Sequence, residues 1–572
     1  MLHRSPVVIR HLFILDIIIG LGLGTLIYGL ILFAGQWHAT FNPSYQIELH
    51  SGSLPLYALF SAMRGLGAYL VSLVFTVAVG YWAAKSAAAE KVIIPLLDIL
   101  QSIPVLGFLP GLVLGLVAIF PHSNVGLELA AILMIFTGQV WNMTFAFYSS
   151  LKSVPGDLQE AAAVMCLSDS TKLMRIELPF SAVNLVWNSI MSMAGGWFFL
   201  TVCEAFTLGN QEYRLPGVGA YMAVAIERGD TRAMLWGVGA MAIIIVTMDL
   251  VIWRPALAWV HRFRLEQTLT GGEDQLINFV YNNSLFLRFM RNFFVKLSRR
   301  ALLKTDSKRL EIKIPVPTFQ FAVLSKWLRW PLAVVLLTAV IWGGVGLINS
   351  LSVLTFANWG EIVIDTLLTF SRVAAAVMLS TLWALPAGVW LSRKEIRLRI
   401  AQPIAQLLAS FPAPMLYPLV LGLTFKAHID FSVGSMVLML LGVQWYILFN
   451  TLAGGLRISR EIYDSMTLMG SSQRDLWRYL YIPSVFPALV TGWVTAAGGA
   501  WNASIVAEYI NYQGSTLETR GLGALISRSA SKGDFAMLSA CLVVMVIFVV
   551  LLNRYFWDRI YRVSQKRFRL DF

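Results

Sequence analysis

Long apolar runs separated by short polar connections recur along the whole chain. Each run holds about 20 residues, enough for one helix to cross the ~30 Å hydrocarbon layer of a membrane. Six such spans fit in each half, near residues 12–34, 59–84, 96–119, 127–150, 181–203, 233–256, 329–350, 366–391, 403–424, 432–455, 484–507 and 536–555. The pattern predicts an all-α polytopic membrane protein with about twelve transmembrane helices.

Basic residues gather in alternate connections between these spans. The clusters are Lys85/Lys91, Lys172/Arg175, Arg393/Lys394/Arg397/Arg399 and the tail from Arg554 to Arg569. Cytoplasmic loops of membrane proteins carry an excess of Lys and Arg, so we expect these connections inside and residues 35–58 outside. Both termini are then cytoplasmic. The first apolar run is too long for a signal-peptide core and lacks a convincing cleavage site, so we expect it to be retained as a span.

The composition supports a membrane protein and excludes several other classes. Of the 572 residues, 57% are hydrophobic and only 13% are charged, about half of the roughly 25% that soluble domains carry. The net charge of +13 resides in short loops between spans, so it does not indicate nucleic-acid binding. The three cysteines and seven histidines are scattered, and we expect neither a disulfide framework nor a metal site.

One long polar stretch, residues 257–327, separates a first half (1–256) from a second half (328–572). Between Leu285 and Leu297, apolar residues share one helical face and basic residues the other. This pattern predicts a cytoplasmic basic linker whose amphipathic helix contacts membrane lipid at the inner leaflet. A solvated linker is the alternative.

The two halves are copies of each other. Residues 195–204 (Gly-Gly-Trp-Phe-Phe-Leu-Thr-Val-Cys-Glu) correspond to residues 499–508 (Gly-Ala-Trp-Asn-Ala-Ser-Ile-Val-Ala-Glu), at a spacing of 304 residues. Further pairs at this spacing, or at 308 residues nearer the N-terminus, are Trp141/Trp445, Pro179/Pro483 and Arg64/Arg372. Because each copy holds an even number of spans, we expect two parallel six-helix repeats about an axis normal to the membrane.

An amphipathic segment lies between the fourth and fifth spans of each half, at about residues 153–179 and 457–483. The first copy has Glu160-Ala161-Ala162 and ends in Ile176-Glu177-Leu178-Pro179; the second has Asp464-Ser465-Met466 and Gly470 and ends in Leu480-Tyr481-Ile482-Pro483. The spacing resembles the EAA loop of ABC-type importer permeases: E-A-A, three residues, Gly, nine residues, Ile-x-Leu-Pro. Cys166 stands where the first copy should have its Gly, so its bend is expected to be a continuous helix or a different turn.

The Pro-rich third spans, and Val506-Ala507-Glu508 followed by Gly521-Leu522-Gly523, look like the nitrate/sulfonate/taurine-type branch of these permeases, fused as two copies. The resemblance implies the type I ABC importer transmembrane fold, in a bacterial inner membrane. It implies two ABC ATPase subunits that dock on the two loops and an extracytoplasmic solute-binding protein that delivers a small anion, such as nitrate, a sulfonate such as taurine, or bicarbonate. The implied ATPase-coupling residues are Glu160, Ala161, Ala162, Cys166, Asp464, Ser465, Met466 and Gly470.

The chain has no Gly-x-x-x-x-Gly-Lys-Ser/Thr phosphate loop, which is the motif that cradles ATP phosphates in such ATPases. We therefore expect ATP and Mg²⁺ on separate ATPase subunits, and no catalytic residue or cofactor on this chain. An ion-coupled secondary transporter with two parallel six-span halves is the alternative class. That class would not require Pro-terminated docking loops at matched positions, so the permease is preferred.

Charged residues within the spans are candidates for the solute path or a gate. Arg64 and Arg372 lie near the outer ends of the second spans, and Glu204 and Glu508 near those of the fifth. Intramembrane charges are costly, so they either face the path or form Arg–Glu pairs within each half, and pairing is preferred for the two carboxylates. Other candidates for lining are Asn188, Trp197, Thr201, Trp501, Asn502 and Ser504. Differences between the halves at these positions predict an asymmetric path, although helix packing explains the Ser and Thr residues equally well.

Overall fold

The computed structural model describes residues 32–37, 41–102, 104–209, 211–260 and 326–567. The predicted span at 12–34 and the predicted amphipathic helix of the linker fall almost entirely outside the described residues. The structure therefore does not test either prediction.

The first half consists of long helices interrupted by short turns and one β-hairpin. Its elements are η1 (Ser51–Ser53), α2 (Leu54–Lys85), α3 (Ala87–Ser102), η2 (Val105–Phe108), α4 (Leu109–Ile119), α5 (Val125–Lys152), α6 (Gly156–Val164), α7 (Asp169–Lys172), η3 (Leu173–Glu177), α8 (Leu178–Cys203), β1 (Ala205–Leu208), β2 (Gln211–Arg214), α9 (Val218–Glu227), α10 (Thr231–Met248), η4 (Asp249–Trp253) and α11 (Arg254–Val260).

The second half begins with the apolar helix α14 (Lys326–Ser352) and then repeats this order. Its elements are α15 (Phe356–Ser392), α16 (Glu395–Ser410), η6 (Ala413–Leu416), α17 (Tyr417–Lys426), α18 (Phe431–Leu456), α19 (Arg460–Leu468), α20 (Gln473–Asp475), η7 (Leu476–Tyr481), α21 (Ile482–Ala507), β3 (Tyr509–Tyr512), β4 (Ser515–Glu518), α22 (Leu522–Lys532), α23 (Phe535–Leu551), η8 (Leu552–Trp557) and α24 (Asp558–Arg567).

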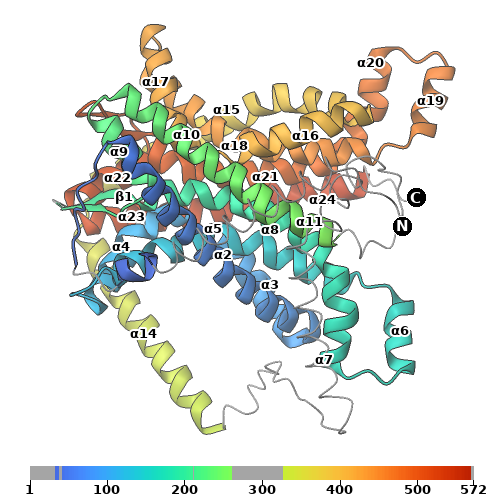
Figure 1. Ribbon diagram of the computed structural model, residues 1–572, viewed down its shortest axis with the longest axis horizontal. Helices are drawn as coiled ribbons and strands as arrows, with labels where there is room; N and C mark the ends of the chain where they lie inside the picture. The colour runs from blue at the N-terminus through green and yellow to red at the C-terminus, as the bar shows by residue number, and fades with distance from the viewer. Residues whose placement is uncertain (1–31, 38–40, 103, 210, 261–325, 568–572) are drawn as a thin grey trace, which may run out of the picture.

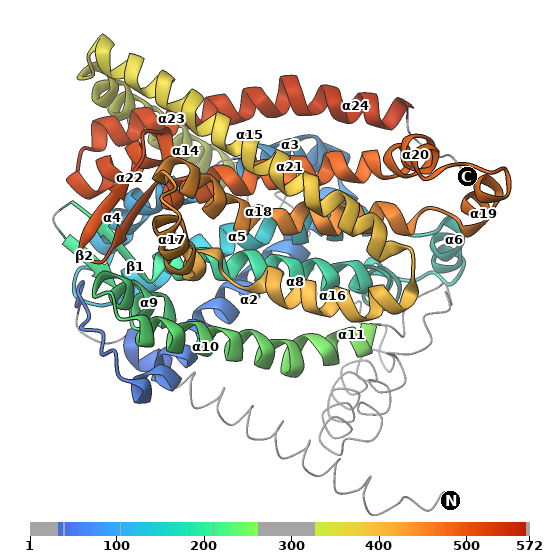
Figure 2. The same ribbon diagram turned by 90° about the horizontal axis from the view of Figure 1, so that it is seen from above.

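The protein is an all-α polytopic membrane protein built from two repeats, as the sequence predicts. Among the described residues, eight helices are long and apolar enough to cross a membrane, or nine if one bent pair counts as a span. These eight coincide with eight of the predicted spans, and α14 covers the predicted span at 329–350. The long helices lie side by side along one direction (Figures 1 and 2).

The third span of each half is broken near a proline, where one continuous span was predicted. In the second half, Glu395–Ser410 and Ala413–Lys426 meet at 86°. The cause is Pro412: the residue before a proline avoids the helical region, and Phe411 is accordingly extended with φ −76° and ψ 127°. In the first half, Pro104 is extended in the same way between α3 and η2.

Two features define opposite ends of the bundle. The short helices α6, α7, α19 and α20 of the two EAA-type segments project at one end, which we call the coupling end (Figure 1). Two β-hairpins, β1–β2 and β3–β4, lie at the other, which we call the hairpin end. These hairpins were not expected from the sequence. The second turns through Gln513 and Gly514, both with positive φ (51° and 73°), which is the two-residue turn that suits twisted hairpins.

The hairpins join the halves through a matched pair of backbone hydrogen bonds. The Gly209 amide donates to the Ala530 carbonyl at 2.9 Å, and the Gln513 amide donates to the Ile226 carbonyl at 3.1 Å. Gly209 and Gln513, like Ile226 and Ala530, are separated by 304 residues. Each hairpin therefore contacts the helix that follows the hairpin of the other half, which is the reciprocal arrangement that two-fold symmetry produces.

Candidate functional site

A cavity of about 520 Å³ lies between the two halves. Its walls come from the bent third segments, the fourth helices α5 and α18, the fifth helices α8 and α21, and from α23, η8 and α24 of the second half alone. Symmetry-related pairs face it from both halves, among them Trp141/Trp445 and Phe145/Phe449. The first half's sixth helix lends it no residue, so the cavity is asymmetric, in line with the sequence-based expectation. We call it the coupling-side cavity.

A second cavity of about 540 Å³ lies toward the hairpin end, and its walls include β1, β2, β3 and β4. The two cavities share no lining residue, and the layer between them is formed where Val105 and Leu106 meet α21. The Val105 amide donates a hydrogen bond to Asn502 Oδ1 at 2.8 Å, which links the two halves directly. The symmetry-related positions are Ala413 and Phe198, which cannot form this bond because Phe has no acceptor.

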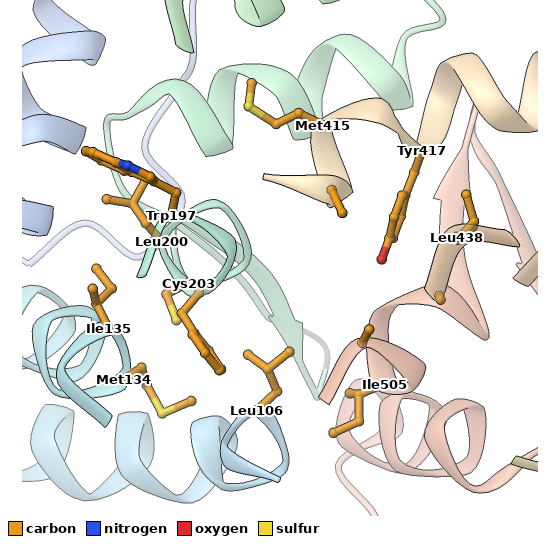
Figure 3. Close-up of a cluster of buried hydrophobic side chains, with 14 of the residues drawn as sticks. Leu106, Met134, Ile135, Trp197, Leu200, Cys203, Met415, Tyr417, Leu438 and Ile505 are labelled. Carbon is orange, nitrogen blue, oxygen red and sulfur yellow. The ribbon is translucent and has the colours of Figure 1, made fainter. Parts of the chain in front are cut away.

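Apolar side chains from both halves pack in this layer (Figure 3). Trp197, Leu200 and Cys203 of α8 lie on one side of the close-up, and Met415 and Tyr417 on the other. All five are buried. A packed layer of apolar side chains between two cavities is a barrier to a hydrated solute.

Arg64 lies at the centre of a buried ionic network in the first half. Its guanidinium donates to both oxygens of Glu128 (2.6 and 2.7 Å), to Glu204 Oε1 (2.8 Å) and to the Pro216 carbonyl (2.8 Å). Glu204 also accepts from the Ser61 hydroxyl at 2.7 Å and from the Gly219 amide at 2.7 Å. Arg64, Glu128 and Glu204 have no solvent exposure.

The second half has the corresponding network around Arg372. Its Nη1 donates to Glu508 Oε1 at 2.8 Å, and its Nη2 donates to the Thr519 hydroxyl at 3.1 Å. Ser432, at 3.0 Å from Nη2, stands at the position of Glu128. Glu508 accepts further bonds from the Thr369 hydroxyl and from two backbone amides that follow Gly521. Each half therefore holds the Arg–Glu pair that was preferred from the sequence, Arg64 with Glu204 and Arg372 with Glu508. None of these four residues lines either cavity.

The Gly-x-Gly motifs are explained by these networks. A Cβ on Gly219 would lie 2.7 Å from the Thr201 carbonyl oxygen, and one on Gly523 would lie 2.5 Å from the Ser504 carbonyl group. Each glycine thus lets the first turn of a helix (α9 or α22) approach a buried carboxylate and donate its amide. The networks consequently fix the hairpin end of the second span against the helix that follows each hairpin.

The other predicted path residues are divided between cavity and core. Thr201 lines the hairpin-side cavity and Asn502 the coupling-side cavity. Trp197, Trp501 and Ser504 are buried, and the Ser504 hydroxyl bonds to a carbonyl of its own helix. Asn188 bonds to Asn184 on the same helix and lines neither cavity. A role in transport stays a prediction for each of them.

The two EAA-type segments share one turn, contrary to the expectation for Cys166. Cys166 has φ 47° and Gly470 has φ 75°, so both residues are left-handed. In each copy the next amide bonds five residues back, Leu167 to Ala162 at 3.0 Å and Ser471 to Met466 at 3.1 Å, which is the Schellman helix end. The first copy therefore keeps the bend without glycine, because the helix-end hydrogen bonds and an exposed side chain allow cysteine to adopt this conformation.

The tips of these segments expose matched apolar pairs that the motif did not reveal. Val164 and Met165 are 84% and 71% exposed, and their equivalents Leu468 and Met469 are 88% and 83% exposed. Of the predicted coupling residues, Glu160, Ala161, Cys166, Asp464, Ser465 and Gly470 are exposed, Met466 is half-buried and Ala162 is buried against the chain itself. Exposed apolar side chains at matched positions make each tip a candidate contact surface.

The base of each segment is joined to the second span, by different chemistry in the two halves. In the first half, Lys85 forms an ion pair with Glu177. At the equivalent positions, the Arg393 guanidinium lies over the rings of Tyr481 (4.1 Å) and Tyr463 (4.2 Å). Because Tyr463 belongs to α19, this cation–π contact ties the projecting helix of the second segment to the end of the second span. The two segments are therefore held at their bases by unlike contacts.

Taken together, a bundle of membrane-spanning helices in two repeats, cavities between the repeats and a matched segment projecting from each repeat at one end are features of a membrane transport permease. The chain belongs to the family of binding-protein-dependent transport system inner membrane components, whose pattern matches residues 76–254 and again residues 376–570. Two such domains therefore follow each other in one polypeptide. The family consists of transport components, so the alternative of an ion-coupled secondary transporter is set aside.

Several curated proteins are similar to this chain. A putative ABC transporter permease protein of Methanocaldococcus jannaschii is 23% identical over 259 residues, which are 44% of this chain and 90% of that protein. The glycine betaine transport system permease protein of Bacillus subtilis is 26% identical over 176 residues, 28% of this chain and 57% of the relative. The taurine transport system permease protein of Escherichia coli is 24% identical over 170 residues, 29% and 56%. The branch of the family stays a prediction.

Proposed function

We propose that this chain is the permease of an ATP-driven importer, with both halves of the solute path on one polypeptide. The observation that carries this proposal is the placement of two EAA-type segments with exposed apolar tips at the same end of a bundle whose halves enclose one cavity. Two ATPase subunits, which hold ATP and Mg²⁺, dock on these tips. A solute-binding protein delivers the cargo at the hairpin end.

This function requires two states, and the structure corresponds to one of them. The coupling-side cavity and the hairpin-side cavity are separated by the apolar layer around Leu106 and Met415. The bent third segments supply this layer, and they contact the fifth helices of the opposite half. A change in the distance between the two EAA-type segments would therefore be transmitted through α8 and α21 to the barrier.

The location and the cargo follow from the same proposal. With the coupling end and both termini on the cytoplasmic side of a bacterial inner membrane, the hairpins face outward. The relatives are named for glycine betaine and taurine, which are small zwitterionic solutes. The anionic cargo expected from the family resemblance stays a prediction.

The proposal is tested by placing charges on the tips. The double variants Val164→Asp/Met165→Asp and Leu468→Asp/Met469→Asp should each abolish stable association with the ATPase, because removing apolar anchors of an interface costs about 2–4 kcal/mol each. The measurement is ATP hydrolysis by the purified complex and its subunit ratio, which should be two ATPase subunits per chain.

Gln473→Asp supplies the matched control, because it adds a negative charge at an exposed position of the same segment away from the tip. It should leave association within about twofold of the unaltered chain, as expected for a surface charge change. ATPase binding that is equally strong in the tip variants, or ATP hydrolysis by the purified chain alone, would contradict the proposed function.

A further inference from the structure

The last helical segment of the chain carries a cluster of arginines at the end of a membrane span. Helix α23, the π-helical segment η8 and α24 form one continuous span that runs toward the coupling end (Figure 2). A surface hollow of about 520 Å³ lies along the final part of this span. The described residues that line the hollow, all of them exposed, are Arg554, Tyr555, Asp558, Arg559, Tyr561 and Arg562.

The three arginines have no carboxylate partner among the described residues. Neither Arg554 nor Arg559 forms an ion pair there, and the Arg562 Nε donates a hydrogen bond only to the backbone carbonyl of Asp558, at 3.3 Å. Three arginines and one aspartate leave the hollow with two net positive charges. Like charges on neighbouring turns of a helix repel one another, so an anion in the hollow would relieve this repulsion.

The fold does not require these arginines. At the spacing of 304 residues, their equivalents in the first half are Leu250, Pro255 and Ala258. The basic residue of that stretch, Arg254, forms an ion pair with Asp249 at 3.0 Å. The same span therefore ends in a neutralised arginine in one half and in three arginines without carboxylate partners in the other. The repeated architecture gives no reason for the cluster.

The depth of the hollow in the membrane follows from the length of the span. Asp534 caps α23 at the hairpin end, where its side chain accepts a hydrogen bond from the Met537 amide at 3.0 Å. Arg554 follows after 554 − 534 = 20 residues, which is about 30 Å of helix at about 1.5 Å per residue. The hydrocarbon layer of a bilayer is ~30 Å thick. Arg554 therefore lies where the hydrocarbon ends and the lipid headgroups begin, and Arg559 and Arg562 follow within about two turns.

A lipid phosphate is the anion that suits this combination of groups. Guanidinium groups bind phosphate oxygens through paired N–H donors, and Tyr555 and Tyr561 add exposed phenol groups beside them. On the same segment Phe556 and Val563 are 49% and 55% exposed, and such apolar surface suits an acyl chain and not a free ion. Basic pockets at the headgroup level of membrane helices bind anionic lipids through the same pairing of charges.

We propose that the hollow on α24 binds the headgroup phosphate of one anionic phospholipid. Arg554 and Arg559 are its main ligands, because Arg562 is partly engaged by the Asp558 carbonyl. Asp558 and Tyr561 line both the hollow and the coupling-side cavity, so the lipid contacts a helix that also forms a wall of that cavity. The inference concerns lipid binding and does not depend on the cargo or on ATP.

Native mass spectrometry of the purified chain in an uncharged detergent tests this proposal. The probes are dioctanoyl phosphatidylglycerol and dioctanoyl phosphatidylcholine, which have the same acyl chains and a phosphate but differ in net charge. We expect the unaltered chain to bind phosphatidylglycerol at least about tenfold more tightly, since each basic residue near a headgroup contributes about fivefold. Inorganic phosphate at equal concentration should not displace this lipid, because it makes no contact with the apolar surface.

Three variants locate the site. Arg554→Gln/Arg559→Gln removes the net charge of the hollow and should reduce the preference for phosphatidylglycerol to about twofold or less. Asp558→Asn removes the carboxylate and should raise the preference at least about twofold, whereas damage to the segment would lower it. The matched control is Arg460→Gln/Arg474→Gln, which removes the same charge from exposed positions on the projecting helices α19 and α20. It should leave the preference unchanged.

Equal affinity for the two lipids, a preference that Arg554→Gln/Arg559→Gln leaves unchanged, or an equal loss in the control would overturn the proposal. Displacement by inorganic phosphate would indicate a site for the free ion instead. Weaker association of Arg554→Gln/Arg559→Gln with the ATPase, at an unchanged lipid preference, would assign the arginines to a protein interface. If that double variant does not fold, Asp558→Asn decides the question, because no increase in preference there contradicts the proposal.

Discussion

Arg64 offers the sharpest test of how the hairpin end is stabilised. Arg64→Leu would leave two carboxylates, Glu128 and Glu204, buried without their cation, and Glu128 receives both of its described side-chain hydrogen bonds from Arg64. Breaking a buried pair by removing one partner costs about 3–5 kcal/mol. Two stranded carboxylates place Arg64→Leu at the upper end of this range or above it.

The second half supplies the comparison. Arg372→Leu strands only Glu508, which still accepts bonds from Thr369 and from two amides, so we expect a loss near the lower end, about 3 kcal/mol. Adding Glu128→Leu to Arg64→Leu removes one stranded charge and should restore at least about 1 kcal/mol. Glu128→Gln alone keeps the shape and one acceptor, and should cost less than Arg64→Leu.

The assay is equilibrium unfolding in mixed micelles of increasing SDS fraction, followed by helical circular dichroism. A midpoint for Arg64→Leu that is no lower than that of Arg372→Leu would refute the reasoning. It would mean that leaving Glu128 buried without its cation does not destabilise the protein. Failure of the double variant to recover stability would refute it as well.

Three further outcomes follow from local geometry. Cys166→Gly should stabilise the first EAA-type segment by about 1 kcal/mol, since glycine adopts the left-handed conformation at φ 47° without strain; hydrogen exchange of the segment's amides measures this. Gly523→Ala should lower the unfolding midpoint by an amount equivalent to about 1–3 kcal/mol, because its Cβ would lie 2.5 Å from the Ser504 backbone. Asn502→Leu should cost about 1–3 kcal/mol by leaving the Val105 amide without its acceptor, and should increase exchange of that amide.

Much of the fold could be predicted because membrane spans are defined by composition over about 20 residues. The repeat then gave independent support, since Trp, Pro and charged residues recur at a constant spacing. The breaks in the third spans were missed although these spans are rich in proline, because apolar character alone does not reveal where a helix is interrupted. The hairpins were missed because they are short, although the β-prone stretch 509–512, followed by Gln513-Gly514, is a usable signal.

The ion pairs of the site could be predicted from the sequence, because a buried charge needs a partner. The walls of the cavity could not, because they depend on how the helices pack. Intramembrane Arg and Glu at matched positions predicted pairing, which the structure shows. Glu128 was missed because the second half has Ser432 at the equivalent position. A comparison of the two halves therefore does not mark Glu128 as a shared charged residue. The cavity walls depend on which helices face the other half. In the structure α23 lines the coupling-side cavity and α10 does not, and the apolar sequences of these two helices do not reveal this difference.

The central claim is that both halves of one chain enclose a single path that ATP opens and closes. Thr495 lines the coupling-side cavity, so Thr495→Cys places a thiol there, and Cys166→Ser removes the exposed native thiol. The most direct measurement is the reactivity of this thiol in the chain assembled with its ATPase subunits in nanodiscs, with and without ATP. We expect ATP to lower this reactivity at least about tenfold, which corresponds to a shift of about 1.4 kcal/mol in the conformational equilibrium. We also expect Leu468→Asp/Met469→Asp to abolish this effect of ATP. Reactivity that ATP leaves unchanged, or an ATP effect that persists in the tip variant, would contradict it.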